Sequence, residues 1–241
     1  MKRIILMAIR SIFQLPFWLY QIFKLCDTEK YDATTRYAYL HKITPIVNKR
    51  GRIKIRSFGL ENLPKETGYI MFPNHQGLFD ALIFLETHER PFVTVMKKEV
   101  KDIFLLKQII KLLKAEIIDR EDVRQSMQVI MNMTKRVKEG ENFVIFAEGT
   151  RSKKGNELLE FKGGSFKSAM NARCPIVPIA LIDSFQAFDT HSIKKLTVQI
   201  HYLKPLYYED YKDMKSTEIA AFVSSQITDT IRANASQQSG E

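Results

Sequence analysis

Apolar and polar positions along most of the chain follow two alternating patterns, one typical of short strands and one typical of amphipathic helices. Residues 52–56 alternate between basic and apolar side chains, which predicts a half-exposed strand. Short, fully apolar runs predict buried strands, and apolar positions spaced three and four residues apart predict helices between them. The expected strands are 52–56, 69–72, 92–95, 116–118, 142–146, 176–180 and 196–203, and the expected helices are 33–49, 78–85, 98–113, 122–138, 164–171 and 216–231.

This succession of strands and helices predicts the class of fold. Alternating β and α units form a sheet whose strands are largely parallel, with helices packed on its faces. We therefore expect residues 51–241 to form an α/β fold with a mostly parallel or mixed central sheet flanked by helices. Ligands of such sheets gather just beyond the carboxyl ends of the strands. Two polar clusters hold that position, residues 74–80 and 148–151.

The first fifty residues form a different segment, which is basic and rich in large apolar side chains. Arg10 interrupts the apolar run and no cleavage site follows it, which argues against a signal peptide. A membrane-spanning helix needs ~20 consecutive, mostly apolar residues, and several polar residues and Pro16 fall inside this stretch. We expect residues 1–50 to be a membrane anchor of helices that lie in the interface and bend near Pro16. Trp18 and Tyr20 are expected at headgroup depth. The alternative is a helical pair that simply packs on the core.

The net charge of +10 is concentrated in the same N-terminal part. Residues 1–60 hold 12 Lys and Arg against 3 Asp and Glu, whereas the remaining residues hold 25 against 24. Nucleic acid and an anionic lipid surface both suit such an asymmetry, but the aliphatic and aromatic bulk between the charges favours lipid. We therefore expect an anionic bilayer and no nucleic acid as a partner, with the protein at the cytoplasmic face of a membrane. Cys26 and Cys174 are far apart and indicate neither a disulfide scaffold nor a metal cluster.

His75 and Asp80 are the first candidates for catalysis. Five residues span roughly 140° of an α-helix, so one continuous helix would not put both side chains on one face. His75 is instead expected in a turn after the strand 69–72, with a helix beginning near Gly77. Asp80 can then reach back and orient the imidazole as a general base. The sequence holds no Gly-x-Ser-x-Gly elbow and no Cys near a His, which suggests that the substrate supplies the hydroxyl. Taken alone, the pattern favours a structural histidine.

Residues 148–151 are the second candidate cluster. They follow the expected buried strand 142–146, and a glycine after a strand lets backbone N–H groups approach an anion. Arg151 can bind a phosphate through two parallel hydrogen bonds. Lys162 lies at the start of the expected helix 164–171, whose N-terminal N–H groups also favour anions. A turn with surface charges explains these residues equally well, and their spacing is not that of a P-loop.

Taken together, the clusters are similar in order and approximate spacing to the four motif blocks of the glycerolipid acyltransferase family, whose best-known members are the 1-acylglycerol-3-phosphate acyltransferases. The residues that carry the resemblance are Asn74, His75 and Asp80, then residues 117–120, then residues 146–152, and finally residues 175–178. Two departures stand out. Ala147 replaces a Pro that is usual in the family, and the stretch between Lys98 and Arg120 lacks its usual Pro and Gly. The second departure predicts a continuous helix such as 103–113 at the lip of the acyl pocket.

The resemblance implies transfer of a fatty acyl group from acyl-CoA or acyl carrier protein to the sn-2 hydroxyl of 1-acylglycerol 3-phosphate (lysophosphatidic acid), without a cofactor or a metal. His75 would deprotonate that hydroxyl, and Asp80 would orient His75. Residues 51–241 would then be the acyltransferase domain. The substrate-binding residues that the resemblance implies are Lys98, Arg120, Arg151 and Lys162 for the phosphate, and Glu148, Gly149 and Thr150 for the rest of the acceptor.

Three other functions stay open at this point. The acceptor could be glycerol 3-phosphate or another lysolipid, within the same family. The protein could be a non-catalytic membrane-binding module that keeps the fold, although intact His75 and Asp80 argue against this. A metal-dependent hydrolase could use His75, Asp80 and His88, but their spacing is irregular for metal ligands.

Overall fold

The structure is a computed structural model that describes residues 2–101, 105–119 and 121–235. At its centre lies a sheet of seven strands in the order β1-β7-β6-β2-β5-β3-β4. The strands are β1 Ile53–Phe58, β2 Ile70–Pro73, β3 Phe92–Lys97, β4 Glu116–Ile118, β5 Asn142–Val144, β6 Ile176–Ile182 and β7 Leu196–Tyr202. All neighbouring strands are parallel except β6 and β7. The prediction of a mostly parallel, mixed sheet is confirmed.

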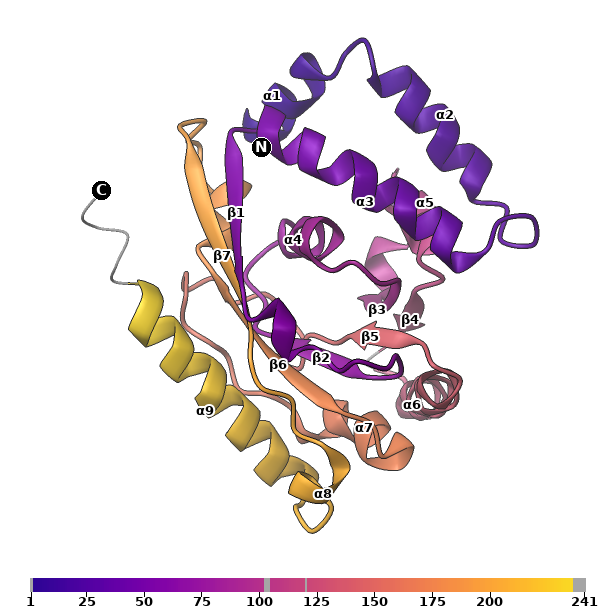
Figure 1. The fold of residues 1–241 in the computed structure, drawn as a ribbon, viewed down its shortest axis with the longest axis vertical. Coiled ribbons are helices and arrows are strands. Elements are labelled where there is room, and N and C mark those ends of the chain that lie inside the picture. The colour runs from indigo at the N-terminus through magenta and orange to yellow at the C-terminus, as the bar shows by residue number, and fades with distance from the viewer. Residues whose placement is uncertain (1, 102–104, 120, 236–241) are drawn as a thin grey trace.

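Helices cover both faces of this sheet (Figure 1). The side chains of β2 alternate between the two resulting cores: Met71 packs in one, and Ile70 and Phe72 pack in the other. The helices of the first face are α1 Lys2–Arg10, α2 Leu15–Leu25, α3 Ala33–Arg50, α4 Asp80–Thr87 and α5 Leu106–Leu112. Those of the second face are α6 Val123–Lys138, α7 Lys167–Ala172, the short α8 Tyr208–Tyr211 and α9 Ser216–Ala235.

The topology gathers the polar clusters at one edge of the sheet. The strands β2 to β6 run in the same direction, so their carboxyl ends meet at this edge. Since β7 runs opposite to β6, and β1 runs parallel to β7, the amino ends of β1 and β7 lie there too. The turn after β2 carries His75, and the turn after its neighbour β5 carries Glu148 and Arg151. The two clusters therefore lie on adjacent strands.

Most expected helices and strands end within a few residues of their predicted limits, with one clear exception. Leu105 has a left-handed backbone with a φ of 69°, and α5 begins only at Leu106. Before it, Lys98–Val100 forms a single 3₁₀ turn. The prediction of a continuous helix through 98–113 is therefore wrong, because a left-handed residue cannot belong to a right-handed helix.

The first two helices of the N-terminal segment, α1 and α2, are bent by 98° relative to one another. The break lies at residues 11–14, just before Pro16, as the sequence predicts. Pro16 itself falls in the first turn of α2, where its missing N–H is not needed. Among the described residues, no single helix is both long and apolar enough to cross a membrane; only α1 and α2 taken as one bent pair satisfy both criteria.

The inward side chains of α1 and α2 belong to the protein core. Met7, Ile22 and Leu25 are buried in the same cluster as residues of α3 and the sheet. Trp18 is only 8% exposed and lies under the Arg50 guanidinium, 5.1 Å from its ring centroid, so the expectation that Trp18 reaches lipid headgroups is wrong. The exposed large side chains of the two helices and their connection are Ile4, Ile5, Ile9, Ile12, Phe13, Phe17, Tyr20 and Phe23.

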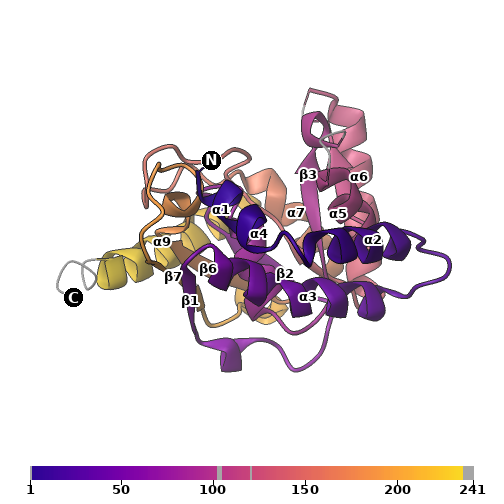
Figure 2. The same cartoon turned by 90° about the horizontal axis from the view of Figure 1, so that it is seen from above.

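Arg3 fastens α1 to the edge of the sheet where the polar clusters lie. Its buried guanidinium donates to the carbonyl oxygens of Gly51 at 2.6 Å, Lys194 at 3.0 Å, and Ala187 and Ser192 at 3.1 Å. Three of these carbonyls belong to the connection between β6 and β7, and Gly51 precedes β1. Figure 2 shows α1 beside these segments. The amphipathic α1 is thus held next to the candidate site.

Candidate active site

Asn74 continues the pairing of β2 with β6 beyond the end of β2. Its side-chain amide donates to the Leu181 carbonyl at 3.0 Å and accepts from the Leu181 N–H at 2.7 Å. The side-chain amide takes the place of a backbone peptide group in the hydrogen bonding between the two strands. The main chain can therefore turn away after Pro73 while the N–H and carbonyl of Leu181 keep hydrogen-bond partners. The turn that follows presents His75.

His75 and Asp80 form the hydrogen-bonded pair that the sequence predicts. His75 Nδ1 lies 2.8 Å from Oδ2 of Asp80, which is the first residue of α4 and fully buried. The same oxygen accepts the N–H groups of Gln76 at 2.8 Å and Gly77 at 3.0 Å. A carboxylate that accepts hydrogen bonds in this way makes Nδ1 the protonated ring nitrogen. Nε2 is then left to accept a proton from a substrate.

The imidazole of His75 is packed between α4 and the turn after β5. Its ring stacks on Phe146, with centroids 4.0 Å apart and 29° between the ring planes. The carbonyl oxygen of His75 accepts the N–H of Ser152 at 2.8 Å. The His75 side chain is 21% exposed, so it stays accessible while its orientation is fixed. A general base requires this combination.

Glu148 joins the turn after β5 to the His75 turn. Its Oε1 accepts the backbone N–H of His75 at 2.6 Å, and its Oε2 accepts the N–H of Leu159 at 2.9 Å. Burial raises the pKa of Glu148, and the hydrogen bonds from these two N–H groups oppose that rise. Both carboxylate oxygens therefore accept hydrogen bonds from the main chain. The contact of Glu148 with the acceptor, which the family resemblance implies, stays a prediction.

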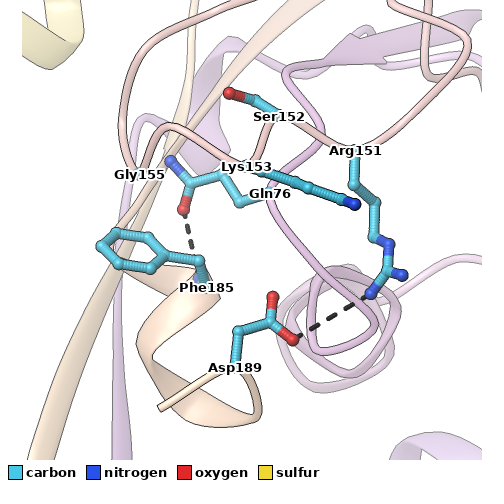
Figure 3. Close-up of a pocket in the computed structure, with 7 residues that line it drawn as sticks. All are labelled: Gln76, Arg151, Ser152, Lys153, Gly155, Phe185 and Asp189. Atoms are coloured by element: carbon cyan, nitrogen blue, oxygen red, sulfur yellow. Dashed lines mark hydrogen bonds and ion pairs between the residues drawn. The ribbon is translucent and has the colours of Figure 1, made fainter.

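A pocket of about 240 Å³ opens beside the His75 turn (Figure 3). Arg151 and Asp189 point toward one another across it, with 4.0 Å between Arg151 Nη1 and Asp189 Oδ1. Arg151 and Lys153 supply two positive charges, which suit a phosphate. The lining residues are Gln76, Arg151, Ser152, Lys153, Gly155, Phe185 and Asp189.

The buried side chain of Gln76 connects this pocket to the end of β6. Its Nε2 donates to Asn156 Oδ1 at 2.8 Å and to the Leu181 carbonyl at 3.0 Å. Its Oε1 accepts the N–H of Ser184 at 2.8 Å. Ser184 begins the 3₁₀ helix η4, Ser184–Ala187, and its hydroxyl donates to Asp80 Oδ1. The connection between β6 and β7 is therefore part of the site, although no sequence motif pointed to it.

Two of the predicted phosphate-binding residues lie away from this pocket or outside the described residues. Lys98 follows β3, and its Nζ lies 3.0 Å from Oδ2 of Asp119, which follows β4. Both are at the carboxyl edge of the sheet, but Lys98 does not line the pocket of Arg151. Arg120 lies outside the described residues.

The remaining predicted residues lie after β5. Gly149 has a left-handed φ of 77°, which closes the turn, and Thr150 is exposed beside it. Lys162 is exposed and lines a second groove, of about 490 Å³, together with α9. Of the predicted basic residues that the structure describes, Arg151 is thus the one that lines the pocket beside His75. Lys153, which lies just outside the motif block 146–152, joins it there.

His88 lies apart from His75 and Asp80. It is fully buried, its Nε2 is 2.7 Å from the Tyr69 hydroxyl, and its Nδ1 is 2.7 Å from the Arg90 carbonyl oxygen. The described residues contain no group of three or more His, Cys, Asp and Glu side chains placed to hold a metal ion. The geometry therefore gives the metal-dependent hydrolase no ligand set in the described part of the chain.

Comparisons with known proteins identify the family of this chain. The sequence profile of a family described as "Acyltransferase" matches residues 54–182, which include the sheet from β1 to β6. The motif resemblance found in the sequence is therefore confirmed.

Curated relatives carry a more specific name. The 1-acyl-sn-glycerol-3-phosphate acyltransferase of Borreliella burgdorferi is 32% identical over 151 residues, which cover 62% of this chain and 60% of that protein. A probable 1-acyl-sn-glycerol-3-phosphate acyltransferase of Mycoplasma genitalium is 28% identical over 213 residues, covering 83% and 78%. The chain thus matches somewhat less than two thirds of the length of the first of these relatives.

A solved structure shares the fold. The crystal structure of the 1-acyl-sn-glycerophosphate (LPA) acyltransferase PlsC from Thermotoga maritima superposes with a TM-score of 0.75 at 19% sequence identity. The match covers 96% of this chain and 92% of that one, so it extends over nearly the whole chain. The predicted fold class is confirmed.

Proposed function

Because the chain belongs to the acyltransferase family, we propose that it transfers a fatty acyl group from an acyl thioester to the sn-2 hydroxyl of 1-acylglycerol 3-phosphate, which yields phosphatidic acid. The observation that supports this most directly is the His75–Asp80 pair beside a pocket with two cations, Arg151 and Lys153. Such a site offers a base for a hydroxyl and a separate anchor for a phosphate on the same substrate. The relatives named above carry the same activity in their names.

In the proposed reaction, Nε2 of His75 accepts the proton of the sn-2 hydroxyl as the oxygen attacks the thioester carbonyl. Asp80 stabilises the imidazolium through its hydrogen bond to Nδ1. The tetrahedral intermediate then collapses: the C–S bond breaks, and the thiolate takes the proton from His75. No enzyme nucleophile is needed, because the acceptor itself forms the new ester bond.

Arg151 holds the acceptor phosphate in this proposal, with Lys153 as a second cation. The phosphate is remote from the reacting oxygen, so its binding energy can be used to hold the hydroxyl against Nε2 of His75. Glu148 acts indirectly in this proposal, by fixing the main chain of His75 through the hydrogen bond from its backbone N–H. Arg120, which the family resemblance also implies, stays a prediction.

We further propose that the N-terminal segment, residues 1–50, binds the surface of an anionic membrane at its cytoplasmic face. The exposed faces of α1 and α2 support this, since they carry large apolar side chains such as Ile9, Phe13 and Phe17. The same segment holds most of the net positive charge, which favours anionic lipids. The acceptor is itself a membrane lipid, so the two proposals fit together.

Product analysis with the purified full chain tests the reaction. The enzyme is supplied with acyl-CoA or acyl carrier protein in turn, and with 1-acylglycerol 3-phosphate, glycerol 3-phosphate or a lysolipid with a larger headgroup. We expect phosphatidic acid from the first acceptor, and a loss of about 10²–10⁴-fold in kcat for His75→Ala. Acylation of glycerol 3-phosphate in preference to the lysolipid, or unchanged turnover in His75→Ala, would overturn the proposal.

A further inference from the structure

The carboxylate of Asp80 accepts hydrogen bonds on both of its oxygens. Oδ2 faces His75 Nδ1 and the N–H groups of Gln76 and Gly77. Oδ1 points the other way, and among the described residues its hydrogen bond comes from the hydroxyl of Ser184. Asp80 is 0% exposed, so water does not take the place of any of these donors. The orientation of the carboxylate therefore depends on donors at both ends.

The main chain fixes the position of Ser184 independently of its hydroxyl. Ser184 is 0% exposed, and its N–H donates to Gln76 Oε1 at 2.8 Å. Its hydroxyl also lies 2.8 Å from Gln76 Oε1, but it has a single proton to give. The contact with Asp80 is the shorter of the two and involves a charged acceptor, so that proton goes to Asp80 Oδ1.

We propose that Ser184 is a positioning residue for the catalytic base: its hydroxyl holds the Asp80 carboxylate so that Oδ2 faces His75. This inference rests on the proposed function, in which His75 accepts the proton of the acceptor. It assigns a role to the connection between β6 and β7, which contributes none of the recognised motif residues. Ser184 does not touch the substrate, so its effect passes through Asp80.

Loss of the hydroxyl changes the geometry of the pair. Oδ1 of Asp80 loses its donor, so the carboxylate can rotate about its Cβ–Cγ bond, which lengthens the hydrogen bond to His75 in part of the population. Asp80 then orients the imidazole less well, and Nε2 of His75 faces the acceptor hydroxyl in a smaller share of the molecules. The titratable groups that face His75 in the described structure are Asp80 from α4 and Glu148 from the turn after β5, and the change leaves both in place.

The test compares Ser184→Ala with Ser168→Ala in the full-length protein. Ser168 is a similarly buried serine in α7, and its hydroxyl has no hydrogen-bond partner among the residues that the structure describes. For Ser184→Ala we expect kcat for 1-acylglycerol 3-phosphate to fall about 10-fold to 100-fold, with the acceptor KM within about twofold of the wild type. Ser168→Ala should change neither kcat nor KM.

A second measurement keeps the inference testable without turnover. The proton on Nδ1 of His75 is followed by NMR in the wild type and in Ser184→Ala, and its resonance should lie further upfield in the variant, because a longer hydrogen bond to Asp80 deshields the proton less. A kcat within about twofold of the wild type, or an unmoved resonance, would overturn the role of Ser184. A wild-type enzyme that does not acylate this acceptor would instead overturn the proposed function, and the NMR result would still decide the role of Ser184.

Discussion

The backbone N–H of His75 donates to Oε1 of Glu148 at 2.6 Å, so the side chain of one motif holds the main chain of the other. Glu148 also accepts from Leu159, and its carboxylate is buried. This arrangement explains how an acidic residue can stand in a site that we propose binds an anionic substrate. Its charge faces two N–H groups rather than the pocket.

Replacing Glu148 by Ala is therefore expected to lower kcat rather than to raise the acceptor KM. Two buried N–H groups lose their acceptor, which should also lower the free energy of unfolding by about 1–3 kcal/mol. Steady-state kinetics and urea unfolding measure the two effects. Glu157→Ala, an exposed acidic residue of the same loop, is the control and should change neither. A raised KM with an unchanged kcat would show that Glu148 contacts the acceptor after all.

Replacing Arg151 should weaken acceptor binding. Arg151→Ala removes the guanidinium that lines the pocket, and we expect the KM for 1-acylglycerol 3-phosphate to rise about 10-fold or more. Arg151→Lys keeps the charge but cannot form the bidentate hydrogen bond to a phosphate, so its KM should lie between those of the wild type and Arg151→Ala. Lys138→Ala serves as control, because Lys138 is an exposed cation at the end of α6, before β5. Equal KM values for Arg151→Ala and the wild type would remove Arg151 from the phosphate site.

Replacing Asp189, in contrast to Arg151, should strengthen acceptor binding. Its Oδ1 lies 4.0 Å from the Arg151 guanidinium, so a bound phosphate competes with this carboxylate for the same cation. Asp189→Asn should lower the acceptor KM by a few-fold, about the effect of one exposed ion pair. The same measurement at high ionic strength should show a smaller difference, because salt screens the pair. If the KM rises instead, Asp189 binds the acceptor directly.

The stability of the protein should fall as the pH drops below neutral. Burial lowers the pKa of His88 from 6.5 to about 4. Between these two pH values, His88 is protonated in the unfolded chain but neutral in the folded chain. The loss begins as the pH falls through 6.5 and is complete below about 4, where it amounts to about 3 kcal/mol. Burial raises the pKa values of Glu86 and Glu148. Their effect on the free energy of unfolding is opposite to that of His88, because the folded chain takes up their protons more readily than the unfolded chain as the pH falls.

A variant isolates the contribution of His88 from these opposing groups. The free energy of unfolding is measured at neutral pH and at about pH 4.5 for the wild type and for His88→Gln. The loss on acidification should be smaller in the variant by about 2–3 kcal/mol. Parallel losses in both proteins would mean that His88 is protonated in the folded state.

Membrane association should depend on outward side chains of the N-terminal helices. Phe13 and Phe17 are 91% and 59% exposed, and the double replacement by Ser should lower binding to phosphatidylglycerol vesicles at least about 10-fold. Phe222→Ser on α9, where the side chain is 43% exposed, is the matched control. Co-sedimentation with vesicles measures both. Unchanged sedimentation of the double variant would contradict the interfacial role.

The sequence predicted those parts of the fold that depend on local patterns. The period-two and helical patterns located most strands and helices, and the spacing of His75 and Asp80 implied the turn that brings them together. Leu105 was missed because nothing in an apolar, helix-favouring stretch marks a left-handed residue. Trp18 was misplaced because an aromatic residue in an amphipathic helix suits either a core or an interface, and only the packing against Arg50 decides.

The missed parts of the site depend on topology. Ser184 lies 104 residues from Asp80 in the sequence, and the two meet only because β6 pairs with β2. Asp189 reaches the pocket through the same connection, which carries no motif in the sequence. An alternation of strands and helices does not specify the order of strands in the sheet. The wall of the pocket opposite Arg151 was therefore not predictable from one sequence.

The four carbonyl oxygens bound by Arg3 set a limit on how the chain can be engineered. A shortened, more soluble form cannot be obtained by trimming α1, because these carbonyls would lose their donors beside the connection that carries Ser184 and Asp189. The release from the membrane that our proposal predicts and the loss of activity would then occur together and could not be told apart. Solubility is better sought by changing outward side chains such as Phe13 while Arg3 is retained.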